Sequence, residues 1–528
     1  MHPVLRPLHR GLLSASLLLL TLAGCGTPLQ SLANLPSNSP FDGNTLPPTP
    51  SIPASAPVLA PNEAGLRIYV NDPIAPASSY VLATNRNHTA DDFPNGQAKL
   101  DKLLELRPTW GQGRYMYRIG HGPTDGRKDY SYMTGYHFEQ EWDKNGPYPY
   151  DDLRNALRDA DTLHAEQLHV INFGTGTPEE AASYVSYLNN PDDPNRKAHP
   201  FPVQNARYFE LGNEISWSMV RGHNKYAATA RQYAQRAEQF AKAMRQASPI
   251  PIKIGAVAST NSNWQGDGWS GGASTVKSIL QTMGNDVDFL IYHGYPSWPM
   301  KKDGDLMTLM AQNAWNDQIL RKEIEPAIQK YETHPVQIAN TEFFTELYSD
   351  PTTARGMFGA VYSADTITLA FNHDMLLANQ FCFDHGNSAD SSFFIDDDPN
   401  KVTPIFQLQK LLAHHWGDDI LRTAGQNLPT RHVDGAAASI DMPVLAFTAA
   451  KGRNGTIYVL VTNRTNDQDV QAHLALGFTP KSAIAYTLGG PNGWKSAPED
   501  VKVTTTQPDL EQPMDFKAAS VTLLEIKP

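Results

Sequence analysis

Between residues 80 and 416, short apolar runs alternate with longer stretches of helical periodicity, and this alternation constrains the fold more than any other feature. Strands that alternate with helices predict an α/β protein with a parallel sheet. The expected strands are Tyr80–Thr84, Tyr115–Ile119, Leu168–Phe173, Arg207–Leu211, Ile252–Ala258, Val287–Tyr292, Val336–Ala339 and Leu376–Phe383. Eight such strands predict a (β/α)8 TIM barrel with insertions. A doubly wound open sheet is the alternative, which the lack of a glycine-rich phosphate loop after an early strand disfavours.

The clearest helical pattern covers 224–247, where apolar residues recur at steps of three and four and so share one helix face. These residues are Tyr226, Ala230, Tyr233, Ala237, Phe240 and Met244. Asn224 is the expected cap at the start of this helix. Pro178 opens another helix over 178–189, because proline fits the first turn and the helix dipole favours the two glutamates that follow. Further helices are expected at about 151–166, 304–331, 352–372 and 404–416.

After residue 418 the pattern changes to short strands that are joined by turns such as Arg453-Asn454-Gly455. This pattern predicts a small β-sandwich over 418–528, behind a barrel domain over 65–417. The early run Leu66–Val70 is expected either to pair with the first barrel strand or to join the sandwich. The expected sandwich strands are Val444–Ala449, Thr456–Thr462, Val470–Leu476, Ser482–Leu488 and Ser520–Ile526.

The first 25 residues have the pattern of a signal peptide rather than of a folded element. Arg6 and Arg10 precede a continuous apolar stretch over 11–23, which is too short to span a bilayer. The sequence Leu22-Ala23-Gly24-Cys25 resembles the lipobox of bacterial lipoproteins, so Cys25 is the expected lipidation site, with an ordinary secretory signal as the alternative. We therefore expect export across the inner membrane and a lipid anchor at the bacterial cell envelope, with Cys382 left as a buried thiol. Residues 26–64 are rich in proline and polar residues and predict a semi-rigid linker.

The charge balance restricts the possible partners. The formal net charge is −12, whereas nucleic-acid binding requires clustered positive charge. A neutral substrate fits this balance. The two cysteines exclude a disulfide scaffold. We expect no metal or cofactor, and the oligomeric state is left open.

Two glutamates stand at the ends of predicted strands. Glu214 ends Tyr208-Phe209-Glu210-Leu211-Gly212-Asn213-Glu214 after the fourth strand, and Glu342 ends Val336-Gln337-Ile338-Ala339-Asn340-Thr341-Glu342 after the seventh. In a barrel both side chains lie at the carboxyl-terminal face, where barrel active sites are built. Cleavage of a glycosidic bond needs one protonated carboxyl and one ionised carboxylate. The pair is therefore a candidate catalytic pair, although each glutamate can also be a loop-edge acid that only caps the next element.

Gly212-Asn213-Glu214, together with Glu342 after the seventh strand, resembles the retaining glycoside hydrolases of clan A, and above all the α-L-arabinofuranosidases and their β-xylosidase relatives. The segment 172–182 and Tyr292-His293-Gly294-Tyr295 are similar to the third- and sixth-strand segments of those proteins. The resemblance implies that Glu214 is the general acid/base and Glu342 the nucleophile. It also implies that Asn213 binds the sugar 2-hydroxyl.

Further substrate-site residues are implied by the same resemblance. Tyr295 and His293 are expected to lie against Glu342. Arg118 is expected to stabilise the negative charge of Glu342, unless Arg118 serves only in a structural ion pair. Trp217 and Trp298 lie in predicted loops on that face and are expected to stack on sugar rings, as are Trp264 and Trp269. Two departures concern the substrate class: the eighth strand contains no tryptophan, and the long aromatic loop 121–150 has no clear counterpart.

Other readings stay open at this point. Glu210 is expected to be a structural carboxylate bound to an inward arginine, and Glu346 an exposed loop acid. Gly268-Trp269-Ser270-Gly271-Gly272 matches the serine-hydrolase motif, but no strand precedes it as that motif requires. Asp396-Asp397-Asp398 is a solvated acidic loop or a calcium site. The functional alternatives are an endo-acting exopolysaccharide hydrolase and a non-catalytic glycan-binding lipoprotein.

Overall fold

The computed structural model describes residues 58–85, 95–119, 152–174, 176–215, 229–259, 272–297, 299–383 and 392–528. The predicted signal peptide with Cys25, most of the predicted linker and the loop 121–150 lie outside the described residues. The same holds for all four loop tryptophans that the sequence singles out as sugar-stacking candidates, namely Trp217, Trp264, Trp269 and Trp298. No helix among the described residues is long and apolar enough to cross a membrane.

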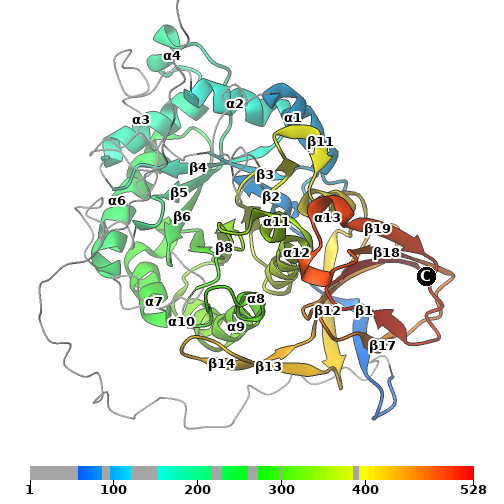
Figure 1. Cartoon of the computed structure of the whole chain (residues 1–528). Helices are drawn as coiled ribbons and strands as arrows, with labels where there is room; N and C mark the ends of the chain where they lie inside the picture. The colour runs from blue at the N-terminus through cyan, green and yellow to red at the C-terminus, as the bar shows by residue number, and fades with distance from the viewer. Residues whose placement is uncertain are drawn as a thin grey trace, which may run out of the picture. The chain divides into compact units, whose positions relative to one another are not determined.

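Eight parallel strands form a closed barrel, which confirms the predicted fold and excludes the open sheet (Figure 1). Each strand pairs in register with the next along the chain, and the last closes onto the first through Ala83↔Asn379 and Thr84↔Gln380. The barrel strands are β2 (Ala83–Asn85), β3 (Met116–Ile119), β4 (Glu166–Ile171), β5 (Tyr208–Leu211), β6 (Lys253–Val257), β7 (Phe289–His293), β8 (Gln337–Phe343) and β9 (Leu377–Gln380). All eight overlap the expected strands. The first expected strand is shorter than predicted, because Ser79–Leu82 forms a 3-10 turn and β2 begins only at Ala83.

Helices surround the barrel and largely follow the predicted pattern (Figure 1). The helix α6 begins at Ala230, where the Thr229 side chain accepts a hydrogen bond from the Gln232 amide; the predicted cap, Asn224, lies outside the described residues. The helices before β8 are α1 (Gly96–Leu103), α2 (Asp152–Thr162), α3 (Pro178–Asn189), α4 (Asn195–Ala198), α6 (Ala230–Ala247), α7 (Gly272–Met283), α8 (Leu306–Met310), α9 (Gln312–Ile319) and α10 (Glu325–Tyr331).

Two predicted helices are interrupted in the structure. The expected helix over 304–331 consists of α8, α9 and α10, and a π-helical turn at Leu320–Ile324 separates the last two. The expected helix over 352–372 is divided at Gly356, whose extended backbone ends one helix and precedes the next. A Cβ on Gly356 would lie 2.3 Å from the Ser496 carbonyl oxygen, so only glycine allows this approach. The helices after β8 are α11 (Pro351–Arg355), α12 (Met357–Asn372) and α13 (Pro404–His414).

The C-terminal strands form a sheet of nine strands that encloses its own apolar core. Apolar side chains from both ends of the strand order, such as Ala485 and Phe516, join one buried cluster, so the sheet curls into the two faces of the expected sandwich. The strand order is β19 (Lys502–Thr506), β18 (Ser482–Gly489), β21 (Val521–Lys527), β16 (Ile457–Asn463), β15 (Leu445–Lys451), β12 (Asp419–Gln426), β1 (Gly65–Pro76), β17 (Val470–Ala475) and β20 (Met514–Phe516).

The early apolar run belongs to this sheet and not to the barrel. Strand β1 pairs antiparallel with β12 and parallel with β17, and its Leu66 and Ile68 are fully buried in the sheet's core. Of the two expectations for Leu66–Val70, pairing with the first barrel strand is therefore wrong. Strand β1 keeps some half-exposed residues, Arg67 and Val70 among them, as a strand in a sandwich does, whereas barrel strands such as β4 are buried on both faces.

Helix α12 joins the barrel to the sheet. Its residues from Met357 to Phe371 are all buried, because one side packs on the barrel and another on β15 and β16. Asp365 in this helix accepts hydrogen bonds from Nε and Nη2 of Arg464, at 3.0 and 2.7 Å, and neither side chain is exposed by more than a tenth. This buried ion pair ties the two parts of the chain together.

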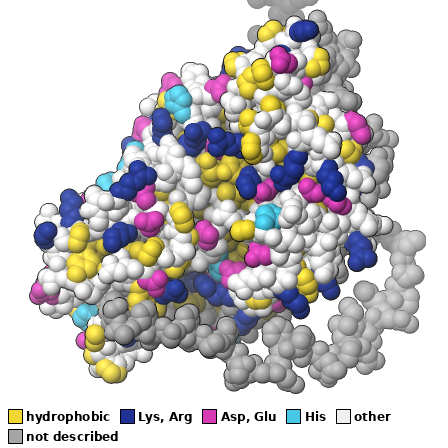
Figure 2. All heavy atoms as spheres, turned by 180° about the vertical axis from the view of Figure 1, so that it is seen from behind, with side chains coloured by type: hydrophobic (Ala, Val, Ile, Leu, Met, Phe, Trp, Pro, Cys, Tyr) yellow, Lys and Arg dark blue, Asp and Glu magenta, His cyan; other side chains and the backbone are white. Residues whose placement is uncertain are grey.

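Two short hairpins lie outside both sheets. Strands β10 (Phe394–Ile395) and β11 (Asp398–Val402) pair after the last barrel strand, and β13 (Thr430–Asp434) pairs with β14 (Ser439–Pro443). The tip of the second hairpin reaches the loop after β7, where the amide of Ala437 donates to the carbonyl of Pro299 at 2.9 Å. Figure 2 shows the face opposite to that in Figure 1, where Lys and Arg side chains are interspersed with Asp and Glu.

Candidate active site

Glu214 is held at the end of β5 by a tight turn. The chain leaves the strand at Leu211 and takes positive φ angles at Gly212 (86°) and at Glu214 (48°). A Cβ on Gly212 would lie 2.4 Å from the Ile215 side chain, so the first position of the Gly-Asn-Glu motif accepts only glycine. The Tyr233 hydroxyl donates to the Leu211 carbonyl at 2.9 Å and accepts from the Val257 amide at 2.8 Å. Helix α6 thus fixes the ends of β5 and β6 on which Glu214 depends.

Glu342 lies inside β8, and its side chain is only 5% exposed. Its backbone carbonyl accepts from the Gly294 amide at 2.6 Å, which ties it to the end of β7. The hydroxyl of Tyr295 donates to Glu342 Oε2 at 2.7 Å, and Arg118 Nη1 donates to Oε1 at 2.6 Å. Each carboxylate oxygen therefore has its own donor. Burial and the Glu342 carboxylate raise the pKa of Tyr295 well above its ordinary value, so the hydroxyl keeps its proton and donates.

Arg118, at the end of β3, is fully buried and connects four polar side chains. Its Nε and Nη2 donate to the two oxygens of Glu210, both at 2.8 Å, while Nη2 also donates to Asn213 Oδ1 at 2.6 Å. Burial lowers the pKa of Arg118, but the carboxylates of Glu210 and Glu342 outweigh burial and raise it. As expected, Glu210 is bound to an inward arginine, and Arg118 also contacts the candidate nucleophile.

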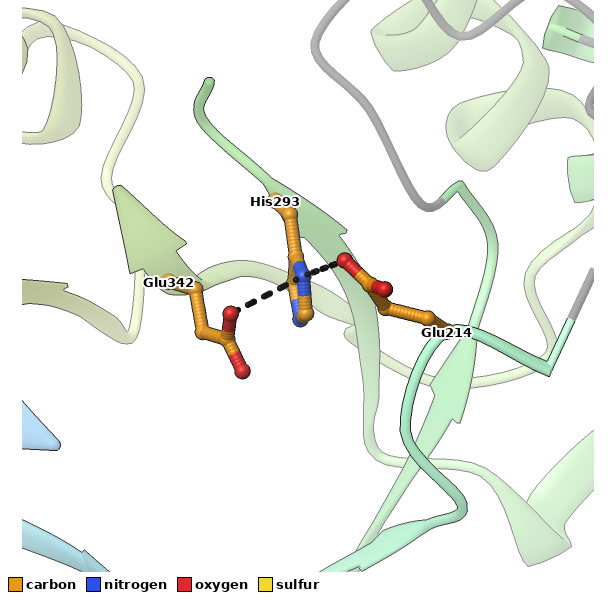
Figure 3. Close-up of side chains that lie close together, drawn as sticks. All are labelled: Glu214, His293 and Glu342. Atoms are coloured by element: carbon orange, nitrogen blue, oxygen red, sulfur yellow. Dashed lines mark hydrogen bonds and ion pairs between the residues drawn. The ribbon is translucent and has the colours of Figure 1, made fainter. Parts of the chain in front are cut away.

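His293 lies between the two candidate catalytic carboxylates (Figure 3). Its Nδ1 is 2.9 Å from Glu214 Oε1 and 3.4 Å from Glu342 Oε2, and its side chain is 1% exposed. The ring nitrogen and one oxygen of each carboxylate all lie within 4.8 Å of one another. Burial lowers the pKa of His293, but the charges of Glu342 and Glu214 raise it above its ordinary value. The ring is therefore held as a donor toward both acids.

The structure brings together six of the residues that the sequence predicts for the site, namely Glu214, Glu342, Asn213, Arg118, His293 and Tyr295. Trp217 and Trp298 lie outside the described residues, so their expected contact with sugar stays a prediction. Asn213 is 1% exposed, and its Nδ2 has no hydrogen-bond partner among the residues that the structure describes. A buried amide with an unused donor is suited to a hydroxyl of a bound sugar.

The comparisons with known proteins concern the fold of the chain. No protein-family model matches the chain. A segment of 97 residues is 33% identical to the probable α-L-arabinofuranosidase C of Aspergillus clavatus; it covers 16% of this chain, which spans only 17% of the length of that relative.

Solved structures match over a much larger part of the chain. The α-L-arabinofuranosidase of Thermotoga maritima, in its arabinose complex, superposes with a TM-score of 0.65 at 18% identity, over 88% of this chain and all of that one. The fold is that of the α-L-arabinofuranosidases. A family 44 xyloglucanase of Paenibacillus polymyxa also superposes, with a TM-score of 0.57 at 12% identity, over 88% of this chain and 99% of that one.

Sequence reasoning missed one polar residue of the site. Asn85, the last residue of β2, accepts from Arg118 Nη1 at 3.1 Å and donates to the Thr341 carbonyl at 2.8 Å. It thereby connects the first barrel strand to the strand that carries Glu342. Glu214 was identified as a polar residue at the carboxyl end of a predicted barrel strand. Asn85 occupies the same kind of position and could have been found by the same criterion.

The expectation that Glu346 is an exposed loop acid is wrong. Its side chain is 27% exposed and accepts from Lys301 Nζ at 2.6 Å, so that the loop after β8 is joined to the loop after β7. Burial raises the pKa of Glu346, and the negative charge of Glu214 acts in the same direction, while Lys301 opposes both. Glu346 therefore belongs to the surroundings of the candidate acid/base.

The acidic loop after the barrel also differs from the expectation. Asp397 pairs with Lys99 Nζ at 3.2 Å, and the Lys99 side chain is fully buried. The loop 396–398 therefore anchors the β10–β11 hairpin to α1 and is not simply solvated. Cys382 is a buried free thiol, as expected. Most of the serine-hydrolase motif, up to Gly271, lies outside the described residues.

A hollow lies at the end of the barrel opposite to Glu214 and Glu342. Its volume is about 1180 Å³, and it is lined by the first residues of three strands, Glu166, Tyr208 and Lys253, together with Arg107 and Gln112. The side chains that carry the candidate chemistry come from the carboxyl ends of the strands and do not reach this hollow. In a barrel the amino-terminal face serves stability, so we assign the active site to the other end.

Proposed function

We propose that this protein is a retaining glycoside hydrolase that acts on an oligosaccharide or polysaccharide, with arabinofuranosidase-like or xylosidase-like specificity. The observation that carries the proposal is the approach of Glu214 and Glu342, which have carboxylate oxygens within 4.8 Å of each other. Retaining enzymes hold their two carboxyl groups about 5–5.5 Å apart, and inverting enzymes about 6.5–9.5 Å apart to admit a water molecule. The observed approach favours retention.

In the proposed first step, Glu342 attacks the anomeric carbon while Glu214 gives its proton to the departing glycosidic oxygen. The bond to the leaving group breaks as the bond to Glu342 forms, which leaves a covalent glycosyl-enzyme. In the second step Glu214 takes a proton from water, and the resulting hydroxide displaces Glu342 from the sugar. Arg118 and Tyr295 hold the nucleophile in one orientation through the first step. The unused donor of Asn213 is assigned to the sugar 2-hydroxyl.

His293 is assigned a positioning role between the two acids. Its Nδ1 binds Glu214 Oε1 at 2.9 Å and so directs this carboxyl toward the nucleophile's side of the mouth. The ring itself is buried and fixed at the end of β7. Glu214 is the more exposed of the two acids, at 17% against 5%, which fits a group that must meet both a leaving group and water.

The test combines substitution with chemical rescue. We expect Glu342→Ala to abolish turnover of aryl glycosides while the fold is kept, and azide to restore turnover with release of a glycosyl azide of inverted anomeric configuration. We expect Glu214→Gln to slow substrates with poor leaving groups most. Near-normal turnover by Glu342→Ala, or equal losses by Glu214→Gln for good and poor leaving groups, would contradict the assignment.

An endo-acting hydrolase is the second candidate. The likeness to a xyloglucanase solved with xyloglucan favours it, because that protein has the same architecture. Product analysis by NMR on a panel of polysaccharides separates the two candidates: release of single sugars supports the first, and release of internal fragments the second. Binding of a glycan without any turnover would support the non-catalytic lipoprotein.

We further propose that Cys25 carries a lipid that anchors the protein at the bacterial cell envelope. Support comes from the apolar stretch before Cys25 and from the polar, proline-rich residues after it. Expression in a Gram-negative host should give a protein that partitions into detergent and has an acylated N-terminal cysteine by mass spectrometry. Cys25→Ser should be soluble after export; equal partitioning of both forms would overturn the proposal.

A further inference from the structure

The three side chains in Figure 3 converge on one point in a manner that also fits a metal ion. Two edges of the triangle, from His293 Nδ1 to the nearest oxygens of Glu214 and Glu342, measure 2.9 and 3.4 Å. A tetrahedral zinc ion with nitrogen and oxygen ligands at about 2.0–2.1 Å places its ligand atoms about 3.3 Å apart. The 2.9 Å edge needs to lengthen slightly and the third edge, at most 4.8 Å, needs to shorten; both involve Glu214, which is the least buried of the three side chains.

The chemistry of the three ligands selects one class of ion. Zinc binds both imidazole nitrogens and carboxylate oxygens, and catalytic zinc sites have three protein ligands with the fourth position left open. Calcium takes six to eight oxygen ligands and magnesium a near-octahedral shell, neither of which this trio supplies. A borderline divalent ion such as zinc is therefore the expected ligand.

The charges around the trio favour a cation. Arg118 is engaged in two hydrogen bonds with Glu210 and contacts Oε1 of Glu342, whereas Oε2 is the oxygen nearest His293. Glu210 offsets the charge of Arg118, so Glu342 and the ionised form of Glu214 together present about two negative charges to an ion at the point of convergence. Tyr295 donates to the same Oε2 and fixes its direction, as residues behind metal ligands commonly do.

Two other histidines in the described part of the chain also lie between two carboxylates, but in a different arrangement. His373 contacts Glu325 through Nδ1 and Asp317 through Nε2, and His432 contacts Asp441 and Asp434 in the same divided way. A single ion cannot reach both nitrogens of one ring. At His293 both carboxylates approach the same nitrogen, which is the arrangement that one ion can bridge.

We propose that Glu214, His293 and Glu342 form a binding site for one zinc ion at the mouth of the barrel. On binding, Nδ1 of His293 and the acid form of Glu214 release their protons to solvent, the lone pair of Nδ1 coordinates the ion, and one oxygen of each carboxylate completes a set of three ligands. The bound ion occupies the space between the two acids and excludes a sugar ring from it. The expected inhibition of turnover by zinc depends on the proposed function. The expected binding of zinc does not depend on it.

Calorimetry on the full chain, treated with EDTA and dialysed, tests the site with zinc chloride as the probe. We expect one zinc ion per chain, and at least tenfold weaker binding in His293→Ala and Glu342→Gln. His432→Ala is the matched control, because it removes a histidine that also lies between two carboxylates, and its zinc affinity should equal that of the wild type. Equal affinity in His293→Ala, or lost binding in His432→Ala, overturns the proposal.

A measurement on the unsubstituted protein guards against variants that fail to fold. Cobalt(II) in a four-coordinate site absorbs visible light much more strongly than octahedral cobalt, so cobalt chloride should give an intense visible band that zinc chloride abolishes. A weak octahedral spectrum overturns the site. Turnover of an aryl glycoside should fall with added zinc, stay unchanged with magnesium and return with EDTA. Turnover that persists with zinc bound supports the zinc site and overturns the catalytic assignment instead.

Discussion

The guanidinium of Arg118 donates two parallel hydrogen bonds to the carboxylate of Glu210, from Nε to Oε2 and from Nη2 to Oε1, each 2.8 Å long. Both side chains are fully buried at the centre of the barrel. The same arginine also contacts Glu342. Glu210 therefore positions Arg118 and partly neutralises the positive charge that Arg118 presents to Glu342. A structural ion pair and the candidate nucleophile thus share one cation.

The first prediction concerns Glu210→Ala. Removal of Glu210 takes away one of the two carboxylates that compensate the buried charge of Arg118, so the free energy of unfolding in urea should fall by about 3–5 kcal/mol. With Glu342 as its remaining carboxylate partner, Arg118 should also stabilise that carboxylate more strongly and make it a weaker nucleophile, which lowers kcat. Glu238→Ala removes the partner of Lys242 in an exposed pair and serves as the control. Equal losses of stability in the two variants would contradict the role given to Glu210.

The second prediction concerns Tyr295→Phe. This change removes only the hydroxyl that donates to Glu342 Oε2 at 2.7 Å. The hydroxyl holds Glu342 in the orientation for attack, and this hydrogen bond to a charged group is worth about 1.5–3 kcal/mol, so loss of the orientation should lower kcat about ten- to hundredfold. KM should change little, since the hydroxyl acts on the nucleophile rather than on the bound sugar. Tyr458→Phe, in the C-terminal sheet, controls for loss of a tyrosine hydroxyl, and an unchanged kcat in Tyr295→Phe would refute the prediction.

The barrel was predictable because most of its strands contain apolar runs that alternate with helical patterns along the chain. The end of β8 was harder to predict. Asn340, Thr341 and Glu342 are polar, as loop residues usually are, yet all three are buried inside the strand. Inside the closed barrel, polar side chains from different strands contact one another. No local sequence pattern reveals these contacts. The contact of Arg118 with Glu210 and Glu342 likewise depends on residues 92 and 224 positions away along the chain.

Other features missed by the sequence have physical causes of the same kind. Strand β19 reads Lys-Val-Thr-Thr-Thr and lies at the exposed edge of the sheet, so it lacks the apolar alternation that marks a strand. The π-helical turn at Leu320–Ile324 keeps the chain helical, and periodicity alone does not distinguish it from an α-helix. The positive φ of Glu214 follows from the turn geometry around Gly212, which only the structure reveals.

The third prediction concerns pH and His373, which lies at the end of α12 and is fully buried. Its Nδ1 contacts Glu325 at 2.6 Å and its Nε2 contacts Asp317 at 2.8 Å, so both nitrogens must carry protons. Burial lowers the pKa of His373, but hydrogen bonds to the two carboxylates raise it above its ordinary value. The pKa values of Asp317 and Glu325 are lowered, since their bonds to His373 and the charge of Arg321 outweigh burial.

The sign of the pH effect follows from these directions. A raised folded-state pKa of His373 means that its contribution is complete below about pH 6.5 and is lost as the pH rises through the raised value. The lowered pKa values of the two acids give a contribution that is present above about pH 4 and is lost in acid. Thermal melts should therefore show the largest gap between the wild type and His373→Gln at about pH 5–6.5, and a smaller gap at pH 9. A gap that widens toward pH 9 would refute the network.

The last prediction concerns the hairpin that reaches from the C-terminal sheet to the loop after β7. Gly435, at its tip, packs so closely that an added Cβ would lie 2.7 Å from the Cα of Met300. The same loop carries Tyr295 and Lys301, which contact Glu342 and Glu346. Displacement of the tip should therefore be transmitted to both acids.

We expect Gly435→Val to lower kcat/KM more than tenfold while the protein stays folded at assay temperature, because a misplacement of about 1 Å near the chemistry costs up to a hundredfold in rate. Gly489→Ala is the control: it adds a side chain at a glycine of the nine-stranded sheet that has no atom within 4 Å of the new Cβ, so kinetics should be unchanged. Steady-state kinetics and a melting curve on both variants check the prediction. If Gly435→Val loses melting temperature but keeps kcat/KM, the hairpin supports only stability, and the C-terminal sheet takes no part in shaping the active site.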